Sequence, residues 1–297
     1  MRMVCAAIAL FSVAAFGAAK KEVQVGADAV WNPGAQIVES IRRDCAKGVS
    51  DCLMAKMAVS GSPAAVAFAK SIGGEGWLRD FRKVGRVDIA YVEYPLRADG
   101  GEGWLLVNGS PSRVDVDDLR KLPRSAMTDN RAWSKLIAQN PRAALFPGDR
   151  VGTTDPVALV YPDGSQQFAV AYAVRDGCAN CGQLGIAFLG FDFSAKGKQG
   201  ETEFLGFDPD ANAARPIRVN AGRKFTLSLK QEPNHEWSIS QAPAKWILRD
   251  AGQTTQGSTL LWTFDVTSNG TTQMVLEYSD NSETLPLRII AEPGLGR

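Results

Sequence analysis

One run of residues, Lys224-Phe-Thr-Leu-Ser-Leu-Lys-Gln-Glu-Pro-Asn-His-Glu-Trp237, indicates how the C-terminal part of this chain folds. Phe225, Leu227 and Leu229 alternate with polar residues, which is the period of a strand with one buried face. A polar loop that contains Pro233 follows, and the closing tryptophan begins a new alternation. The run therefore predicts two strands of a β-structure joined by a short exposed loop.

The same pattern continues to the end of the chain. We expect strands at 224–230, 237–240, 260–266, 273–278 and 285–291, separated by turn-rich segments such as 252–257. Short strands at this spacing predict that residues 217–297 form an all-β, immunoglobulin-like sandwich. Its inward rows are expected to be Phe225, Leu227, Leu229, Trp237, Trp262, Phe264, Met274, Leu276, Tyr278, Leu287 and Ile289.

This block resembles the chagasin-type inhibitors of papain-like cysteine proteases, over about a quarter of the chain. The resemblance rests on a glycine before the strand Phe-Thr-Leu-Ser-Leu, a loop with a proline that closes on a tryptophan, and several later features. These are Gly257, the strand Trp262-Thr-Phe264, Gly270 and Val275-Leu-Glu-Tyr278.

The resemblance implies that three loops at one end of the sandwich enter the protease cleft. The implied binding residues are Pro233, Asn234, His235, Trp237 and Gly257. Pro233 and Trp237 match the first loop of the family, whereas residues 279–284 replace the Arg-Pro-Trp expected in the third loop.

The larger N-terminal region mixes helical and strand patterns. Helices are expected from Pro33 to Cys45 and at 51–58, 64–72 and 129–139, because caps and prolines precede segments with helical periodicity. Strands are expected at 87–94, 104–107, 156–161, 166–174 and 184–193. The order predicts an α+β domain, a helical cluster plus an antiparallel sheet, over residues 20–207. A polar segment without periodicity at 208–216 is the expected linker to the sandwich.

Residues 1–19 have the pattern of a signal peptide. Arg2 precedes an apolar run, and the small residues Gly17 and Ala19 favour cleavage after Ala19. We therefore expect a periplasmic or secreted protein. The apolar run is too short to span a bilayer, and no longer one follows.

Four cysteines remain after such a cleavage, and in an oxidising compartment they predict two disulfides. Four cysteines allow three pairings, of which we favour the local ones, Cys45 with Cys52 and Cys178 with Cys181. The Cys-x-x-Cys spacing of the second pair also occurs in thiol oxidoreductases, where a helix usually follows the motif. Here strands flank it, which favours a structural disulfide.

Composition and charge narrow the range of functions. Hydrophobic residues make up 45% and charged residues 22%, which is typical of a globular protein. The net charge of +1 does not indicate the basic surface that binds nucleic acid. The chain has one histidine and no Gly-x-Ser-x-Gly, metal-binding or dinucleotide motif. These observations favour a protein that is not an enzyme and holds no metal or cofactor.

Three hypotheses follow. The first is an exported inhibitor that binds a papain-like cysteine protease through the sandwich loops. The second is an envelope-associated ligand-binding or structural protein without inhibitory activity, favoured if Trp77, Trp104 and Tyr94 line a cleft. The third is a thiol oxidoreductase that uses Cys178 and Cys181.

Overall fold

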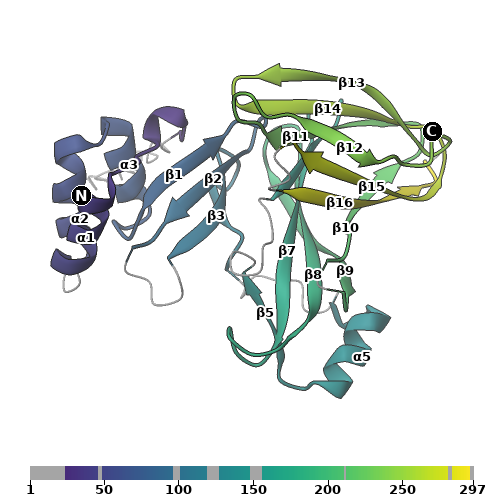
Figure 1. Ribbon diagram of the computed structural model, residues 1–297, viewed down its shortest axis with the longest axis horizontal. Coiled ribbons are helices and arrows are strands. Elements are labelled where there is room, and N and C mark those ends of the chain that lie inside the picture. The colour runs from purple at the N-terminus through teal and green to yellow at the C-terminus, as the bar shows by residue number, and fades with distance from the viewer. Residues whose placement is uncertain are drawn as a thin grey trace, which may run out of the picture.

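The structure is a computed structural model of the 297-residue chain, and it describes residues 24–45, 49–95, 101–118, 127–147, 156–210, 212–279 and 283–294. The expected signal peptide, residues 1–19, lies outside the described residues. Three N-terminal helices are followed by antiparallel strands, and a β-sandwich ends the chain (Figure 1). The expected order, an α+β region and then a β-sandwich, is confirmed at this level.

The described residues begin with a small helical cluster. After the short 3-10 helix η1 (Ala27–Ala29) come α1 (Ala35–Asp44), α2 (Val49–Ser60) and α3 (Pro63–Ser71). Ser62 caps α3, because its hydroxyl accepts a hydrogen bond from the amide of Ala65 at 3.0 Å. The helices share a core with the two tryptophans Trp31 and Trp77, whose rings meet edge to face at 5.3 Å. This buried aromatic pair ties the cluster to the first strand.

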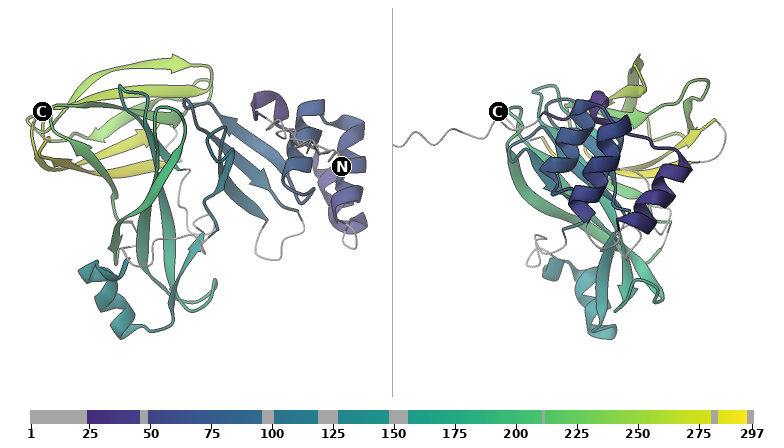
Figure 2. Two further views of the ribbon diagram at one scale, coloured as in Figure 1. Left: turned by 180° about the vertical axis from the view of Figure 1, so that it is seen from behind. Right: turned by 90° about the vertical axis from the view of Figure 1, so that its left-hand side faces the viewer.

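A four-stranded antiparallel sheet follows, in the order β1 (Trp77–Arg82), β2 (Asp88–Glu93), β3 (Glu102–Val107) and β4 (Arg113–Asp115). One face packs against α3 through Phe68 and Ala90. The other face packs against the next sheet through Ile89, Leu106 and Phe168. The small sheet therefore lies between the helices and the rest of the molecule, as the left view of Figure 2 shows.

The central sheet joins strands from distant parts of the chain, in the order β13-β14-β11-β6-β7-β8-β9 with β5 beside β7. Its N-terminal members are β5 (Ala143–Pro147), β6 (Val157–Val160), β7 (Gln166–Asp176), β8 (Gln183–Phe193) and β9 (Gln199–Asp208). Helix α5 (Arg131–Gln139) packs on β9, where Trp133 contacts Phe204 and Phe207.

The C-terminal strands of this sheet are β11 (Lys224–Lys230), β13 (Leu248–Gln256) and β14 (Thr259–Val266). A second sheet faces them, in the order β10 (Arg215–Asn220), β16 (Thr284–Glu292), β15 (Gly270–Tyr278) and β12 (Trp237–Gln241). All eleven residues predicted for the inward rows are buried in the core between the two sheets.

Strands from both sides of the expected linker pair with each other. Thr226, Leu227 and Ser228 of β11 lie opposite residues 158–160 of β6. The expected linker 208–216 begins with the last residue of β9, Asp208, and ends with the first two residues of β10, Arg215 and Pro216. The division of the chain into domains there stays a prediction. The structure adds that the two regions share one continuous sheet.

Candidate functional site: three loops at one end of the sandwich

Three loops of the sandwich meet at one of its ends, which we call the loop end. They are residues 231–236 between β11 and β12, 257–258 between β13 and β14, and the connection between β15 and β16, of which Ser279 and Glu283 are described and residues 280–282 lie outside the described residues. Successive strands run in opposite directions, so alternate connections lie at the same end (Figure 1). All five residues that the family resemblance implied lie at or directly beside this end.

The first loop is a tight turn. The amide of His235 donates to the carbonyl oxygen of Glu232 at 3.2 Å, which closes a four-residue turn with Pro233 and Asn234 at its centre. Asn234 has a φ of 66°, and proline followed by a residue with positive φ is the pattern of a type II turn. Pro233 and Asn234 are exposed and form the tip.

Hydrogen bonds join the first loop to the other two. The amide of Gln231 donates to the carbonyl oxygen of Ser258 at 2.8 Å, which links it to the β13–β14 turn. The amide of Ser279 donates to the carbonyl oxygen of Glu236 at 3.0 Å, and the amide of Glu236 donates to the Ser279 hydroxyl at 3.1 Å. These contacts hold the loops to one another before any partner arrives.

An aromatic stack supports the first loop from beneath. The Tyr278 ring lies 5.4 Å from the His235 ring, nearly parallel to it, and 5.1 Å from the Trp237 ring. The Tyr278 hydroxyl accepts from the amide of Glu232 at 2.6 Å, and Trp237 Nε1 donates to the carbonyl oxygen of Lys230 at 2.8 Å. Trp237 is therefore part of the sandwich framework. His235 packs on the Tyr278 ring and is not at the tip of the loop.

Sequence reasoning did not identify Gln231 or Ser258 as parts of this site, and it named Ser279 only as the start of the third loop. They contribute through backbone groups and one hydroxyl, which carry no composition signal. Gly257 was identified, and its φ of 60° in the two-residue β13–β14 turn explains why glycine suits that position.

The loop end adjoins the small N-terminal sheet. Lys230, the last residue of β11, forms an ion pair with Asp80 of β1 at 2.9 Å and lies 3.8 Å from Glu232 in the first loop. Figure 1 shows the end of β1 beside the sandwich at this point. A partner that approaches the loops therefore meets β1 as a neighbour.

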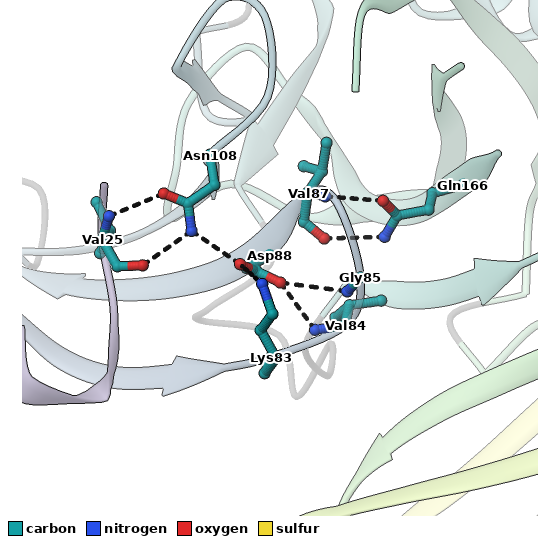
Figure 3. Close-up of polar contacts among 8 residues, drawn as sticks. All are labelled: Val25, Lys83, Val84, Gly85, Val87, Asp88, Asn108 and Gln166. Carbon is teal, nitrogen blue, oxygen red and sulfur yellow. Dashed lines mark hydrogen bonds and ion pairs between the residues drawn. The ribbon is translucent and has the colours of Figure 1, made fainter. Parts of the chain in front are cut away.

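Buried polar contacts fix the small sheet in this position (Figure 3). The Gln166 side chain of β7 pairs with both backbone groups of Val87, at 2.7 Å and 2.8 Å. Asn108 pairs in the same way with Val25, and it also donates to the carboxylate of Asp88 at 2.8 Å. Amide side chains here replace strand pairing, so they join segments that no sheet connects.

The described residues hold a second polar cluster, between β8, β9 and β10. Burial raises the pKa of Asp192, although a hydrogen bond from Gln167 opposes this effect. Burial also raises the pKa of Glu203, while the Arg218 guanidinium, 3.4 Å away, lowers it. Among the residues that the structure describes, no three side chains of His, Cys, Asp or Glu gather where they could hold a metal ion.

The cysteine pairs form as predicted. Cys45 is bonded to Cys52, and Cys178 is bonded to Cys181. The second disulfide closes the tip of the β7–β8 hairpin, where a strand follows it and not the helix that lowers thiol pKa in redox enzymes.

The aromatic residues considered for a ligand cleft lie in different surroundings. Trp77 is completely buried and Tyr94 is 4% exposed, each within a hydrophobic core. Trp104 is half-buried and packs against Tyr91 with ring centroids 4.4 Å apart. The three side chains do not line a common cleft.

Comparisons with known proteins do not identify a family. No family model matches the chain, and no curated protein matches it. A solved structure, that of surface layer protein SbsC, domains 1-6, is similar at 9% identity with a TM-score of 0.21. The match covers 48% of this chain and 29% of that chain, so this chain spans less than a third of its length. Of the helices in the described part of the chain, none has the length and apolar character needed to cross a bilayer.

Proposed function

We propose that this protein is an exported binding protein, not an enzyme, whose loop end inhibits a papain-like cysteine protease. The observation that carries the proposal is the set of hydrogen bonds that fixes the three loops beside one another. Loops that are already ordered lose little conformational entropy when they dock, so more of the contact energy remains as affinity.

The strand order supports an immunoglobulin-like sandwich, which is the fold that the chagasin resemblance implies. At one edge of the central sheet the strands have the order β13-β14-β11. The facing sheet has the order β10-β16-β15-β12, with β10 parallel to β16. The ends of the strands that flank the three loops lie at one end of this arrangement, which supports the proposal.

In this proposal the exposed tip residues Pro233 and Asn234, together with Gly257, contact the protease. His235 and Trp237 act as supports, since both pack on Tyr278. The two disulfides are compatible with an oxidising compartment, and we place the protein in the periplasm or outside the cell.

The test is inhibition of papain by the full chain, followed with a small fluorogenic peptide substrate. The full chain is needed because excision of the sandwich would remove β6 from the edge of β11. We expect hydrolysis to slow in a concentration-dependent manner. Unchanged hydrolysis at high micromolar concentrations of the protein would refute the proposal.

A pair of matched variants locates the effect. Asn234→Gly keeps the positive φ of the turn but removes the side chain at the tip, so we expect inhibition about tenfold weaker, the equivalent of one good contact. Asn269→Gly makes the same change in an exposed turn between β14 and β15, at the opposite end, and should inhibit like the wild type. Equal loss in both variants would contradict a role for the loop end.

A further inference from the structure

The two disulfides in the described part of the chain differ in how openly they face solvent. Cys178 is exposed and Cys181 is half-buried, both at the tip of the hairpin that β7 and β8 form. Cys45 is completely buried, and its partner Cys52 is half-buried against the core of the helical cluster. A thiol exchanges with a disulfide only where it can reach one of the sulfur atoms, so access decides which disulfide reacts. The structure therefore favours reaction at Cys178.

Backbone contacts and an ion pair hold the hairpin tip in place without the disulfide. Strands β7 and β8 pair along their length up to the residues that flank the tip. The amide of Asp176 donates to the carbonyl oxygen of Gly182 at 3.2 Å. The amide of Cys181 donates to the carbonyl oxygen of Cys178 at 3.1 Å, and the Asp176 carboxylate pairs with Arg142 at 2.8 Å. None of these contacts involves a sulfur atom, so the tip can keep its conformation when the disulfide is reduced.

The buried disulfide is placed differently. It joins Cys45, at the end of α1, to Cys52 in the first turn of α2, and Cys45 lies in one core with Met57. Its reduction would leave a thiol in that core and remove a link between two packed helices. A buried group becomes accessible through local opening, and the free energy of that opening slows every reaction that requires it. The two disulfides thus differ both in access and in what the fold loses on reduction.

Charged side chains at the tip favour one of its two sulfurs as the leaving group. Arg175 Nη1 donates to the carbonyl oxygen of Cys181 at 3.0 Å, so the guanidinium lies beside this cysteine. The carboxylate of Asp176 is neutralised by its ion pair with Arg142. A neighbouring guanidinium stabilises a thiolate, and a disulfide sulfur leaves more readily when its thiolate is stabilised. Attack at Cys178, which expels Cys181, is therefore the favoured direction.

We infer that Cys178–Cys181 is a thiol–disulfide exchange site that accepts electrons from an external dithiol, whereas Cys45–Cys52 is a structural link. One thiolate of the dithiol attacks Cys178 Sγ, the S–S bond breaks, and Cys181 leaves as a thiolate that takes up a proton. The second thiolate of the dithiol then attacks the reagent sulfur of the mixed disulfide and expels Cys178, which is protonated in turn. The dithiol becomes a disulfide and the protein gains two thiols, so two electrons and two protons are transferred.

This role is not that of a thiol oxidoreductase. In those enzymes a helix that follows the Cys-x-x-Cys motif stabilises the attacking thiolate, whereas here β8 follows the motif. The chain is therefore the substrate of the exchange, and its partner supplies the nucleophile. Strands β7 and β8 extend away from the sandwich in Figure 1, so the exchange site and the loop end are different parts of the molecule. The inference does not depend on the proposed inhibition.

The experiment is limited reduction of the folded, full-length protein with dithiothreitol in the absence of denaturant. Free thiols are alkylated with iodoacetamide at successive times and located by peptide mass spectrometry, while circular dichroism reports on the fold. We expect the Cys178–Cys181 pair to be labelled at least about tenfold faster than the Cys45–Cys52 pair, with an unchanged spectrum. Reduced glutathione, a monothiol, should form a mixed disulfide at Cys178.

A matched pair of variants tests the guanidinium beside Cys181. In reduced Arg175→Gln we expect alkylation of Cys181 to be about threefold slower than in the reduced wild type at pH 7, and equally fast at pH 10, where the thiols are ionised in both proteins. Arg249→Gln removes an exposed guanidinium from β13 and should react like the wild type at both pH values.

Several outcomes would overturn the inference. They are equal labelling rates for the two disulfides, no labelling of Cys178 and Cys181, and labelling of this pair only together with loss of the circular dichroism signal. Glutathione attached to Cys181, or an Arg175→Gln variant that is alkylated like the wild type at pH 7, would contradict the direction of attack.

Discussion

Asp88 allows us to predict how much the polar contacts in Figure 3 contribute to the free energy of unfolding. Its side chain is completely buried, and its carboxylate accepts four hydrogen bonds. The amides of Val84 and Gly85 donate to Oδ1 at 2.9 Å and 3.2 Å, and Lys83 Nζ and Asn108 Nδ2 donate to Oδ2 at 2.9 Å and 2.8 Å. The perturbation is Asp88→Ala, with Asp88→Asn as the conservative variant.

The expected loss follows from the partners. Lys83 is 63% exposed, so its ammonium returns to water at little cost when the carboxylate is removed. The other three donors lose an acceptor in partly buried positions, at about 1 kcal/mol each, so Asp88→Ala should lower the free energy of unfolding by about 3 kcal/mol. Asp88→Asn keeps the acceptor for Val84 and Gly85 but turns an NH₂ group toward two donors, and should cost about 2 kcal/mol.

Urea titration and thermal unfolding, both followed by circular dichroism, measure these losses. For a chain of this size a loss of 3 kcal/mol corresponds to a fall of about 6–12 °C in Tm. Asp129→Ala, which removes an exposed aspartate, is the control and should leave Tm unchanged. A loss below about 1 kcal/mol for Asp88→Ala would show that water replaces the carboxylate, and the reasoning from buried donors would be wrong.

Two further predictions concern stability. Replacing Cys45 and Cys52 by alanine removes a disulfide with a sequence separation of 7 and should lower the free energy of unfolding by about 2.5 kcal/mol. The same change at Cys178 and Cys181, which are separated by 3, should lower it by about 1.9 kcal/mol, because a shorter closed loop restricts the unfolded chain less. The opposite order in urea titrations would contradict this argument from loop entropy. Burial raises the pKa of Asp192, so the folded state favours its protonated form, and the stability it contributes is present at low pH and is lost as pH rises through the raised pKa. Asp192→Asn should therefore raise Tm at pH 7 and have a smaller effect on Tm near pH 4. Equal effects on Tm at the two pH values would contradict a raised pKa for Asp192.

The sequence predicted best those strands that bury one face. Phe225, Leu227 and Leu229 alternate in the sequence, and all three are buried between the sheets. The local disulfides were also predictable, because a short separation limits where each cysteine can reach. Both are cases in which neighbouring residues along the chain carry the relevant information.

Strand β13 shows where this reasoning fails. We expected residues 252–257 to form turns, but they belong to β13 and its turn, and all residues from Arg249 to Ser258 are exposed. An edge strand with solvent on both faces needs no apolar alternation, so glycine, glutamine and threonine give no strand signal. Only the pairing with β14 keeps this segment extended, and that pairing depends on the fold.

The pairing of β6 with β11 has the largest consequence for the candidate site. In a separate sandwich, Thr226, Leu227 and Ser228 would form an open edge directly before the first loop; here β6 occupies that edge. The same β6 pairs with β7, and the Gln166 side chain of β7 bonds to both backbone groups of Val87, which directly precedes β2, the strand paired with β1. The first loop is therefore linked through β11, β6 and β7 to the small sheet whose Asp80 reaches back to Lys230. This closed circuit of contacts connects the loop end to its neighbour β1, so the two form adjoining parts of one surface. If the proposed inhibition holds, the protease needs an open surface beside its cleft, where β1 can be accommodated.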